Sequence, residues 1–262
     1  LYFLPRFQPI ELVKPFLIIF ISLILCSRKF SNIYIKYLCS FIITLGIALL
    51  LSLQPDVGQT LLVFFSWSVL IFTSGVSIFL LFFLFSSIIL IFFYLIFFVS
   101  KFTYIKNRLI SFIDSETGTY NFQSDRALES ITSGGFFGKG IGEGTLKNRV
   151  PEAHTDYIIS VISEEFGVIA IILIFLLFLV FIYSVFKKVN FENDETIKLI
   201  LVGSVSLILM QTIIHIGVNI RLFPTTGMTL PFISYGGSSI ISISILSGII
   251  LNFTKRNLNQ NE

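Results

Sequence analysis

The sequence contains few charged residues for its length. Its 18 Lys and Arg and 15 Asp and Glu residues make up 13% of 262 residues, and its mean hydropathy is +0.92. A soluble protein of this size needs far more charged side chains to cover its surface, and its core could not hide 31 Phe residues. The composition therefore excludes a soluble enzyme, a nucleic-acid-binding module and a disordered chain, and predicts an integral membrane protein.

Cysteine and histidine are also scarce. The two cysteines, Cys26 and Cys39, fall at the cytoplasmic ends of predicted spans, where the compartment is reducing, so we expect free thiols and no disulfide. Two His residues and the absence of closely spaced cysteines give no pattern typical of a structural metal site. The net charge of +3 is too small to indicate a polyanionic partner.

Long uncharged runs, by contrast, fill most of the chain. A transmembrane helix needs about 20 apolar residues, and seven segments qualify, whereas the alternation typical of membrane β-strands is missing. We therefore predict an all-α, polytopic transmembrane helical bundle of about seven spans, with one long extracytoplasmic loop at residues 101–157. The predicted spans are residues 9–27, 37–53, 59–77, 78–100, 158–186, 199–220 and 230–253.

The orientation follows from the basic residues of the short connections. Basic residues in short loops mark the cytoplasmic side of a membrane protein, and three groups fall on one side of the alternating spans. Loop 101–157 then lies outside the cell. The three groups are Arg28, Lys29 and Lys36; Lys187, Lys188 and Lys198; and Lys255 with Arg256.

Polar motifs gather at the opposite, outer membrane boundary. Ionisable groups at this depth are costly, so each is a candidate functional residue, although a structural role stays open for every one. Glu11 and Lys14 can neutralise each other within one helical turn, Asp56 can cap a helix, and Asp156 can be a carboxylate favoured by the helix dipole. His215, inside a span, is expected to hydrogen bond to a neighbouring helix.

A glycine-rich stretch at residues 134–144 has the composition of a nucleotide-binding loop but not its pattern. A phosphate-binding loop needs Ser or Thr after its lysine, and here Gly140 follows Lys139. We instead expect a flexible or re-entrant hairpin at the membrane surface.

Five separated motifs extend over nearly the whole chain: QPIELVK (8–14), QPDVGQT (54–60), SGG (133–135) with the glycines of 138–142, PEAHTDYIISVISEEFG (151–167) and FPTTGMTLPFISYGGSS (223–239). In this order they resemble the motifs of the SEDS family of peptidoglycan glycosyltransferases, which includes FtsW, RodA and SpoVE. Ala153 and the run 224–231 are more similar to FtsW, the division member, than to RodA.

The resemblance implies a ten-span fold, so the chain would be one N-terminally truncated integral-membrane domain, residues 1–262, with the last seven spans. It implies polymerisation of lipid II, an undecaprenyl-pyrophosphate disaccharide-pentapeptide, into glycan strands at the outer face of the bacterial cytoplasmic membrane during cell division, at the septum. It also implies a class B penicillin-binding protein and other division proteins as partners, and a divalent cation, Mg²⁺ or Mn²⁺, as cofactor.

The family's essential aspartate corresponds to Asp156 in the HTD sequence. It would be the catalytic residue, either as the general base for the attacking hydroxyl or as the ligand of the metal. Lys14 would neutralise the pyrophosphate as a point charge, with Arg149 as a second cation. Further candidates for substrate binding are Glu11, Asp56, Glu152, His154, Ser234 and Tyr235.

Two other functions remain open at this point. A lipid II flippase or transporter would also have many spans with charges, but it predicts polar groups distributed across the membrane, whereas here they cluster at the outer boundary. A non-catalytic division scaffold is the second alternative, because seven helices without the first three would leave faces of the bundle exposed. The activity of the chain on its own is therefore open.

Overall fold

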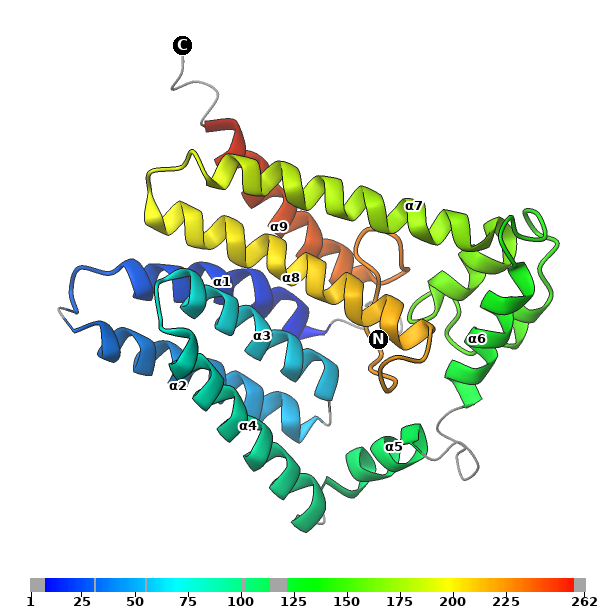
Figure 1. Cartoon of the computed structure of the whole chain (residues 1–262), viewed down its shortest axis with the longest axis horizontal. Helices are drawn as coiled ribbons and strands as arrows, with labels where there is room; N and C mark the ends of the chain where they lie inside the picture. Colours follow the sequence, from blue (N-terminus) through cyan, green and yellow to red (C-terminus); the bar gives the residue numbers. More distant parts are fainter. Residues whose placement is uncertain (1–7, 31, 55, 100–101, 114–121, 257–262) are drawn as a thin grey trace, which may run out of the picture. The chain divides into compact units, whose positions relative to one another are not determined.

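A computed structural model describes residues 8–30, 32–54, 56–99, 102–113 and 122–256 of the chain (Figure 1). These residues form helices, turns and loops without any β-strand, which confirms the all-α prediction. The helices are α1 (Pro9–Cys26), α2 (Ile33–Leu53), α3 (Val57–Thr73), α4 (Ile78–Phe98), α5 (Thr103–Ile113), α6 (Phe122–Gly134), the short 3-10 helix η3 (Leu146–Arg149), α7 (Ile158–Val189), α8 (Glu195–Asn219) and α9 (Gly237–Arg256).

Seven of these helices correspond to the seven predicted spans. Within the described residues, α1, α2, α7, α8 and α9 are long and apolar enough to cross a membrane, and α3 is a shorter apolar helix of 17 residues. Helix α4 has 21 residues, none of them charged. The side chains of α2 and α7 are largely exposed and those of α8 largely buried, so α2 and α7 present apolar faces suited to lipid.

The last span begins later than predicted. Residues 230–236 were expected to be helical, but Phe232 has a φ of +65° and α9 starts only at Gly237. The Ser234 backbone N–H donates to the Leu230 carbonyl (3.1 Å), and the Ser234 hydroxyl accepts from the Leu230 N–H (2.8 Å), which closes a turn instead. The prediction was wrong here because apolar residues continue through a segment whose side chains bond to their own backbone.

The chain divides into two compact units, which are described separately. Unit 1 consists of residues 1–95, 182–210 and 237–262, and unit 2 of residues 96–181 and 211–236. The prediction of a single integral-membrane domain therefore stays a prediction.

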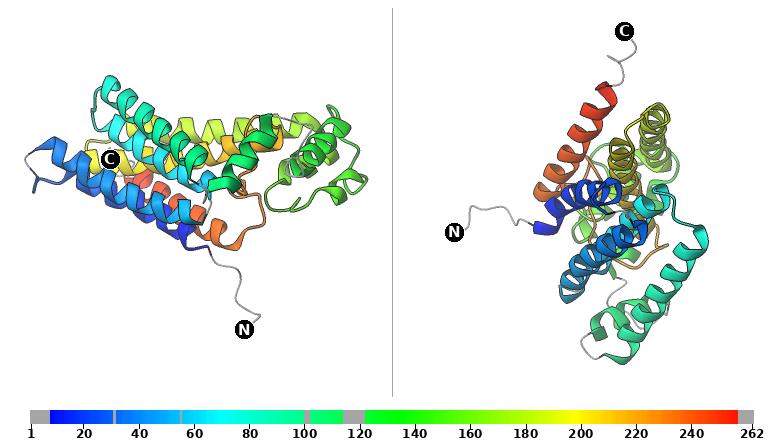
Figure 2. Two further views of the ribbon diagram at one scale, coloured as in Figure 1. Left: turned by 90° about the horizontal axis from the view of Figure 1, so that it is seen from below. Right: turned by 90° about the vertical axis from the view of Figure 1, so that its left-hand side faces the viewer.

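In unit 1, α1 packs against α2, α3 and α9, and α2 packs against α3 (Figures 1 and 2). Trp67, which is only 2% exposed, belongs to an apolar core that includes residues of α1, α2 and α3. Its indole Nε1 donates to Ser40 Oγ (3.1 Å), and the Phe41 ring lies with its centroid 5.4 Å from the indole. A buried indole needs such an acceptor, so this bond fixes α3 against α2.

In unit 2, α6 lies against the first part of α7 at very short range. Ser130 Oγ lies 3.2 Å from the Ser160 carbonyl oxygen, and the Ser163 hydroxyl donates to the Ile131 carbonyl (3.3 Å). A Cβ atom at Gly134 would lie 2.0 Å from the Ser163 carbonyl oxygen, so only glycine permits this approach. The described residues of the predicted extracytoplasmic loop 101–157 include the helices α5, α6 and η3, and its position outside the membrane stays a prediction.

Candidate functional site

Asp156 lies in a tight turn directly before α7 and is half-buried. Its backbone N–H donates to the carbonyl of Glu152 (3.1 Å), and Glu152 itself adopts a left-handed φ of +55°. The Thr155 hydroxyl donates to the Glu152 carboxylate (3.1 Å). The turn therefore places two acidic residues, Glu152 and Asp156, within one short segment.

Donors from other parts of the chain hold this turn through three successive carbonyl oxygens, those of residues 154–156. Each accepts one hydrogen bond: from the Tyr235 N–H (3.0 Å), the Ser234 hydroxyl (2.6 Å) and the side-chain amide of Asn219 (3.1 Å) respectively. These three donors come from the end of α8 and from the segment before α9. The backbone that carries Asp156 is thus held by side chains and amides more than 60 residues away in sequence.

The segment between α8 and α9, residues 220–236, forms a strap beside Asp156. Gly227 has a φ of +67°, and a Cβ built on it would lie 3.5 Å from Asp156 Oδ2, which places the strap backbone next to the carboxylate. Left-handed φ values favour glycine. The sequence Pro224–Pro231, recognised at first only as a motif, therefore lies against the candidate catalytic group.

Helix α8 fastens the strap from one side. The Gln211 amide donates to the Thr229 carbonyl (2.9 Å), and His215 Nδ1 lies 2.7 Å from the Met228 carbonyl oxygen. His215 was expected to bond to a neighbouring helix, but its partner is the strap. Because a carbonyl only accepts, Nδ1 carries the proton in this contact.

Two arginines connect the strap to helices α5 and α6. Arg108, on α5, donates to the Thr225 carbonyl (3.1 Å), and Arg221, on the strap, forms an ion pair with Asp125 of α6 (2.6 Å). All of these contacts lie inside unit 2. The strap is thus positioned by α5, α6 and α8 together.

Several buried polar atoms surround this turn. Tyr157 is buried, and both this burial and the neighbouring Asp156 raise the pKa of its hydroxyl, so Tyr157 stays neutral. Its hydroxyl, Asn219 Oδ1 and Thr226 Oγ1 have no hydrogen-bond partner among the described residues. Polar atoms of this kind hydrogen bond to solvent or to a ligand, so the surroundings of Asp156 can accept a polar substrate.

The donor set around Asp156 fits a divalent cation only in part. The described residues contain no group of three His, Cys, Asp or Glu side chains able to hold a metal ion. Mg²⁺, however, is often bound by one or two carboxylates together with substrate phosphates. Asp156 could therefore hold a cation with a pyrophosphate that supplies the other ligands.

A second polar group, in unit 1, contains three further candidates. Lys14 Nζ lies 2.8 Å from the Glu11 carboxylate, and the Gln59 amide donates to the same carboxylate (2.8 Å). Lys14 is 1% exposed and Glu11 2% exposed, so the ion pair is buried between α1 and α3. Asp56 caps α3, accepting from the Gln59 N–H (3.1 Å). The predicted pairing and the predicted cap are both present, and roles of these residues toward a substrate stay predictions.

The remaining candidates differ in exposure. Glu152, His154 and Tyr235 are at least partly exposed, Arg149 is exposed at the end of η3, and Ser234 is buried with its hydroxyl committed to the turn. The structure thus brings Glu152, His154, Ser234 and Tyr235 to Asp156 through the backbone contacts described above.

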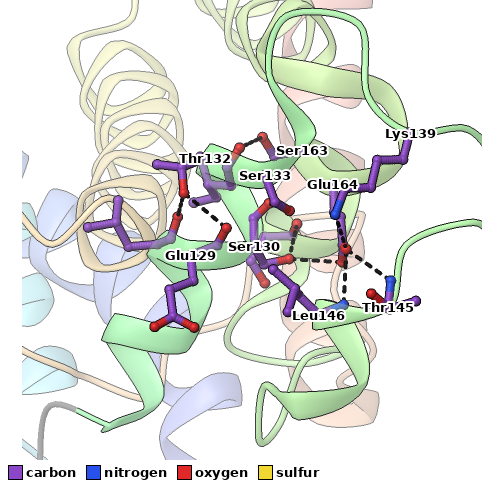
Figure 3. A network of polar contacts seen from close by, with 12 residues as sticks. Glu129, Ser130, Thr132, Ser133, Lys139, Thr145, Leu146, Ser163 and Glu164 are labelled. Atoms are coloured by element: carbon purple, nitrogen blue, oxygen red, sulfur yellow. Dashed lines mark hydrogen bonds and ion pairs between the residues drawn. The ribbon is translucent and has the colours of Figure 1, made fainter.

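Sequence reasoning missed Glu164, a fully buried carboxylate eight residues after Asp156 (Figure 3). Its Oε1 accepts from the N–H groups of Thr145 (2.9 Å) and Leu146 (3.0 Å) and from Lys139 Nζ (3.2 Å), and its Oε2 accepts from the Ser130 hydroxyl (3.1 Å). The pair Glu164-Glu165 in an otherwise apolar helix was the available signal. Asn219, a polar residue at the outer end of a predicted span, gave a similar signal.

Comparison with known proteins decides the family. A model of the FtsW, RodA and SpoVE family, described as cell cycle protein, matches residues 4–259. The chain belongs to this family. The five motifs had indicated the same family, and they span the same part of the chain.

Relatives in the family support the resemblance to FtsW. The probable peptidoglycan glycosyltransferase FtsW of Caulobacter vibrioides (strain NA1000 / CB15N) is 35% identical over 253 residues, which cover 95% of this chain and 63% of the relative. The probable peptidoglycan glycosyltransferase FtsW of Enterococcus hirae is 32% identical, covering 97% of this chain and 67% of the relative. The chain thus spans about two thirds of the length of these relatives.

Solved structures show the same multi-span fold. A chain from a peptidoglycan synthase complex, described for its coordination of polymerization and crosslinking, matches with a TM-score of 0.78 at 26% identity and covers 97% of this chain and 72% of that chain. The rod shape determining protein RodA of Thermus thermophilus matches with a TM-score of 0.63 at 25% identity, over 95% of this chain and 66% of that chain.

Proposed function

We propose that this chain acts as a peptidoglycan glycosyltransferase that polymerises lipid II at the outer face of the cytoplasmic membrane, with Asp156 as its catalytic residue. The observation that supports this role is the way in which the Asp156 turn is held. Three donors fix the carbonyls of residues 154–156, so the carboxylate has a defined place beside the strap. A general base must be held in this way, since small misplacements cost much of its effect.

The reaction needs a base and a stabilised leaving group. A sugar hydroxyl of one lipid-linked saccharide attacks the anomeric carbon of another, and its proton passes to the Asp156 carboxylate. The bond from that carbon to the undecaprenyl pyrophosphate breaks, and its electron pair leaves on the pyrophosphate oxygen. Near this carboxylate, the neutral Tyr157 hydroxyl would donate to a substrate oxygen, and Asn219 Oδ1 would accept from a substrate hydroxyl, since its two N–H groups are already bonded. In the second possibility, Asp156 would instead hold a divalent cation, which would supply positive charge to the leaving group.

Substrate and partners follow from the family. We propose lipid II as substrate, a class B penicillin-binding protein as the partner that cross-links the product, and the division septum as the site of action. The FtsW relatives and the match to a peptidoglycan synthase complex support this choice. We also propose Mg²⁺ or Mn²⁺ as a cofactor, which one carboxylate would share with the phosphates of the substrate.

The test is glycan-strand formation from purified lipid II by the complete natural chain with Asp156→Asn. Because general base catalysis contributes about 10²–10⁴-fold, we expect polymerisation to fall by at least about 100-fold while the protein remains folded. Asp194→Asn is the matched control. Asp194 caps α8, accepting from the Thr196 N–H (2.8 Å), and asparagine caps equally well, so activity should not change.

The outcomes separate the alternatives. Undiminished polymerisation by Asp156→Asn would remove Asp156 from the mechanism. If Asp156 holds the cation, the variant should regain activity at higher Mg²⁺ or Mn²⁺ concentration, whereas loss of a base is not rescued. Movement of labelled lipid II across vesicle membranes without any polymer would favour the flippase alternative.

A further inference from the structure

The glycine-rich stretch at residues 134–144, here called the glycine hairpin, is fixed on α7 by its backbone. The N–H groups of Lys139 and Gly140 donate to the carbonyls of Glu164 (2.9 Å) and Glu165 (3.0 Å), and the Val168 N–H donates to the Gly135 carbonyl (3.0 Å). Figure 3 shows Lys139 of the hairpin over Glu164 of α7. The hairpin is therefore a defined structure on the helix, and its predicted place at the membrane surface stays a prediction at this point.

Two glycines make this contact possible. A Cβ at Gly138 would lie 2.2 Å from the Glu165 carbonyl oxygen, and a Cβ at Gly167 would lie 2.0 Å from the Phe136 carbonyl oxygen. Both residues also have left-handed φ values, +77° and +79°. The hairpin thus sits directly on the kink that Gly167 introduces into α7.

The same hairpin carries large apolar side chains on its outside. Phe136, Phe137 and Ile141 are 74%, 83% and 78% exposed. Three such residues within six positions are unusual on a surface that faces water, and an exposed apolar patch marks a contact with protein or lipid. The nearby Lys139 forms an ion pair with the buried Glu164 carboxylate, so its charge is directed away from these apolar side chains.

The depth of the hairpin can be derived from α7. Between Gly167 and Lys187 lie 19 uncharged residues, Val168–Phe186. At 1.5 Å per residue they span roughly 28 Å, about the thickness of the hydrocarbon core. With Lys187 and Lys188 at the cytoplasmic headgroups, Gly167 lies at the outer edge of the hydrocarbon, and the hairpin fixed to it lies at the same level.

We propose that the tip of the glycine hairpin, with Phe136, Phe137 and Ile141, inserts into the outer leaflet of the membrane and holds the hairpin at the lipid surface. Lipid is the occupant that the depth favours, because these side chains stand at the hydrocarbon boundary and aromatic residues concentrate there. The anchor would hold the segment that leads to Asp156 at a constant height above the lipid headgroups. The membrane contact itself does not depend on the proposed enzymatic activity.

Tryptophan fluorescence tests this proposal in the complete natural chain. Residues 1–262 contain a single tryptophan, Trp67, which is buried, and the fluorescence of the unsubstituted protein is recorded and subtracted as the background. Phe137→Trp adds a second fluorophore at a highly exposed position, where substitution does not disturb packing. The protein is reconstituted in bilayers whose phospholipids carry bromine at successive depths along the acyl chain, and the aqueous quencher iodide is titrated separately.

We expect the added tryptophan to emit at shorter wavelength than in water and to lose most of its fluorescence to bromines in the upper acyl chain, because interfacial side chains are buried by about 5–10 Å. Iodide should have little effect. Glu129→Trp is the control, since Glu129 is an exposed residue of α6 outside the hairpin, and it should show the opposite pattern.

Two results would overturn the proposal. Quenching of the fluorophore added by Phe137→Trp with iodide and not with brominated lipid would place the hairpin in water. Protection from both quenchers would show that protein covers the tip. Neither result bears on Asp156, so failure of the membrane anchor and failure of the proposed function are distinguishable.

Discussion

Glu164 and Asp156 are two carboxylates of one short chain segment, and they are held in opposite ways. The Glu164 side chain is fully buried and its oxygens accept from four donors, two of them backbone N–H groups. At Asp156 the distant donors hold the backbone carbonyls of the turn, and the carboxylate is half-buried beside Gly227. Because fixed donors hold the Glu164 side chain, this carboxylate is suited to a structural role. At Asp156 the distant donors hold the backbone of the turn, which suits the catalytic role proposed for its side chain.

The two carboxylates also depend on different parts of the chain. Glu164 joins the glycine hairpin and η3 to α7, all within residues 130–167. Asp156 depends on the strap and the end of α8, which follow it by more than 60 residues. Local contacts thus hold Glu164, and distant contacts hold the turn that carries Asp156, the proposed catalytic residue.

The largest loss of stability is expected from a substitution that blocks the close contact between the glycine hairpin and α7. In Gly138→Ala the new methyl group would meet the Glu165 carbonyl at 2.2 Å, so the hairpin must move away from the helix and take with it Lys139, one of the donors to Glu164. We expect a loss of stability of about 4 kcal/mol or more, at the upper end of single substitutions. Thermal unfolding of the protein in lipid nanodiscs measures it.

Gly142→Ala is the matched control for this substitution. Gly142 has a similar φ of +82°, but a Cβ there has no heavy atom within 4 Å. Its cost should be only the left-handed strain of about 1–2 kcal/mol. Equal losses for the two variants would show that conformation alone, and not the close approach, makes glycine necessary.

The second effect, smaller than the first, is expected from Glu164→Gln. The amide replaces one acceptor oxygen by a donor and removes the charge opposite Lys139, so the four donors around it are no longer all satisfied. We expect a loss of about 2–4 kcal/mol in nanodisc unfolding, as for breaking a buried charge pair. Glu165→Gln, in which the exposed bond from the Gly142 N–H is weakened, should cost less than about 1 kcal/mol.

If instead Glu164→Gln unfolds like the unchanged protein but no longer forms glycan strands, Glu164 would be part of the reaction and the contrast with Asp156 would fail. Loss of stability with activity reduced only in proportion to the unfolded fraction supports the structural role.

Much of the fold followed from composition and charge, because membrane spans are set by length and apolarity alone. The seven helices, the Glu11–Lys14 pair and the Asp56 cap could be predicted, since each depends on residues within one turn or one span. The start of α9 could not, because Ser234 bonds to the strap backbone and to Thr155, a residue 79 positions earlier.

In the candidate site, Asp156 was predicted from the sequence, whereas the residues that hold it in place were not. Motif similarity singled out Asp156, whereas Asn219 and Gly227 reach it only through tertiary contacts that no local pattern encodes. Glu164 was overlooked for a related reason. Its partners, Ser130, Lys139 and the N–H groups of residues 145–146, come from three separate segments.

The third effect concerns the support of Asp156 by α8. In Asn219→Ala the Asp156 carbonyl loses its side-chain donor, and so does the His215 carbonyl (2.9 Å). We expect a stability loss of about 1–2 kcal/mol and a fall in kcat for strand formation that exceeds the loss of folded protein. A fall in proportion to folding alone would show that Asn219 does not position the reactive group.

The smallest effect is expected from Ser234→Ala. The Ser234 hydroxyl donates to the Thr155 carbonyl and accepts from the Leu230 N–H, so its removal leaves both buried groups without this partner (2.6 and 2.8 Å). We expect about 1 kcal/mol of lost stability and a modest fall in kcat, because the Tyr235 N–H and the Asn219 amide still hold the adjacent carbonyls. Ser247→Ala is the control, since that hydroxyl bonds within α9, to the Ile243 carbonyl. If Ser234→Ala abolished polymerisation without loss of stability, the Ser234 hydroxyl would contact the substrate directly. Ser234 would then take part in the reaction and would not only support the backbone of the Asp156 turn.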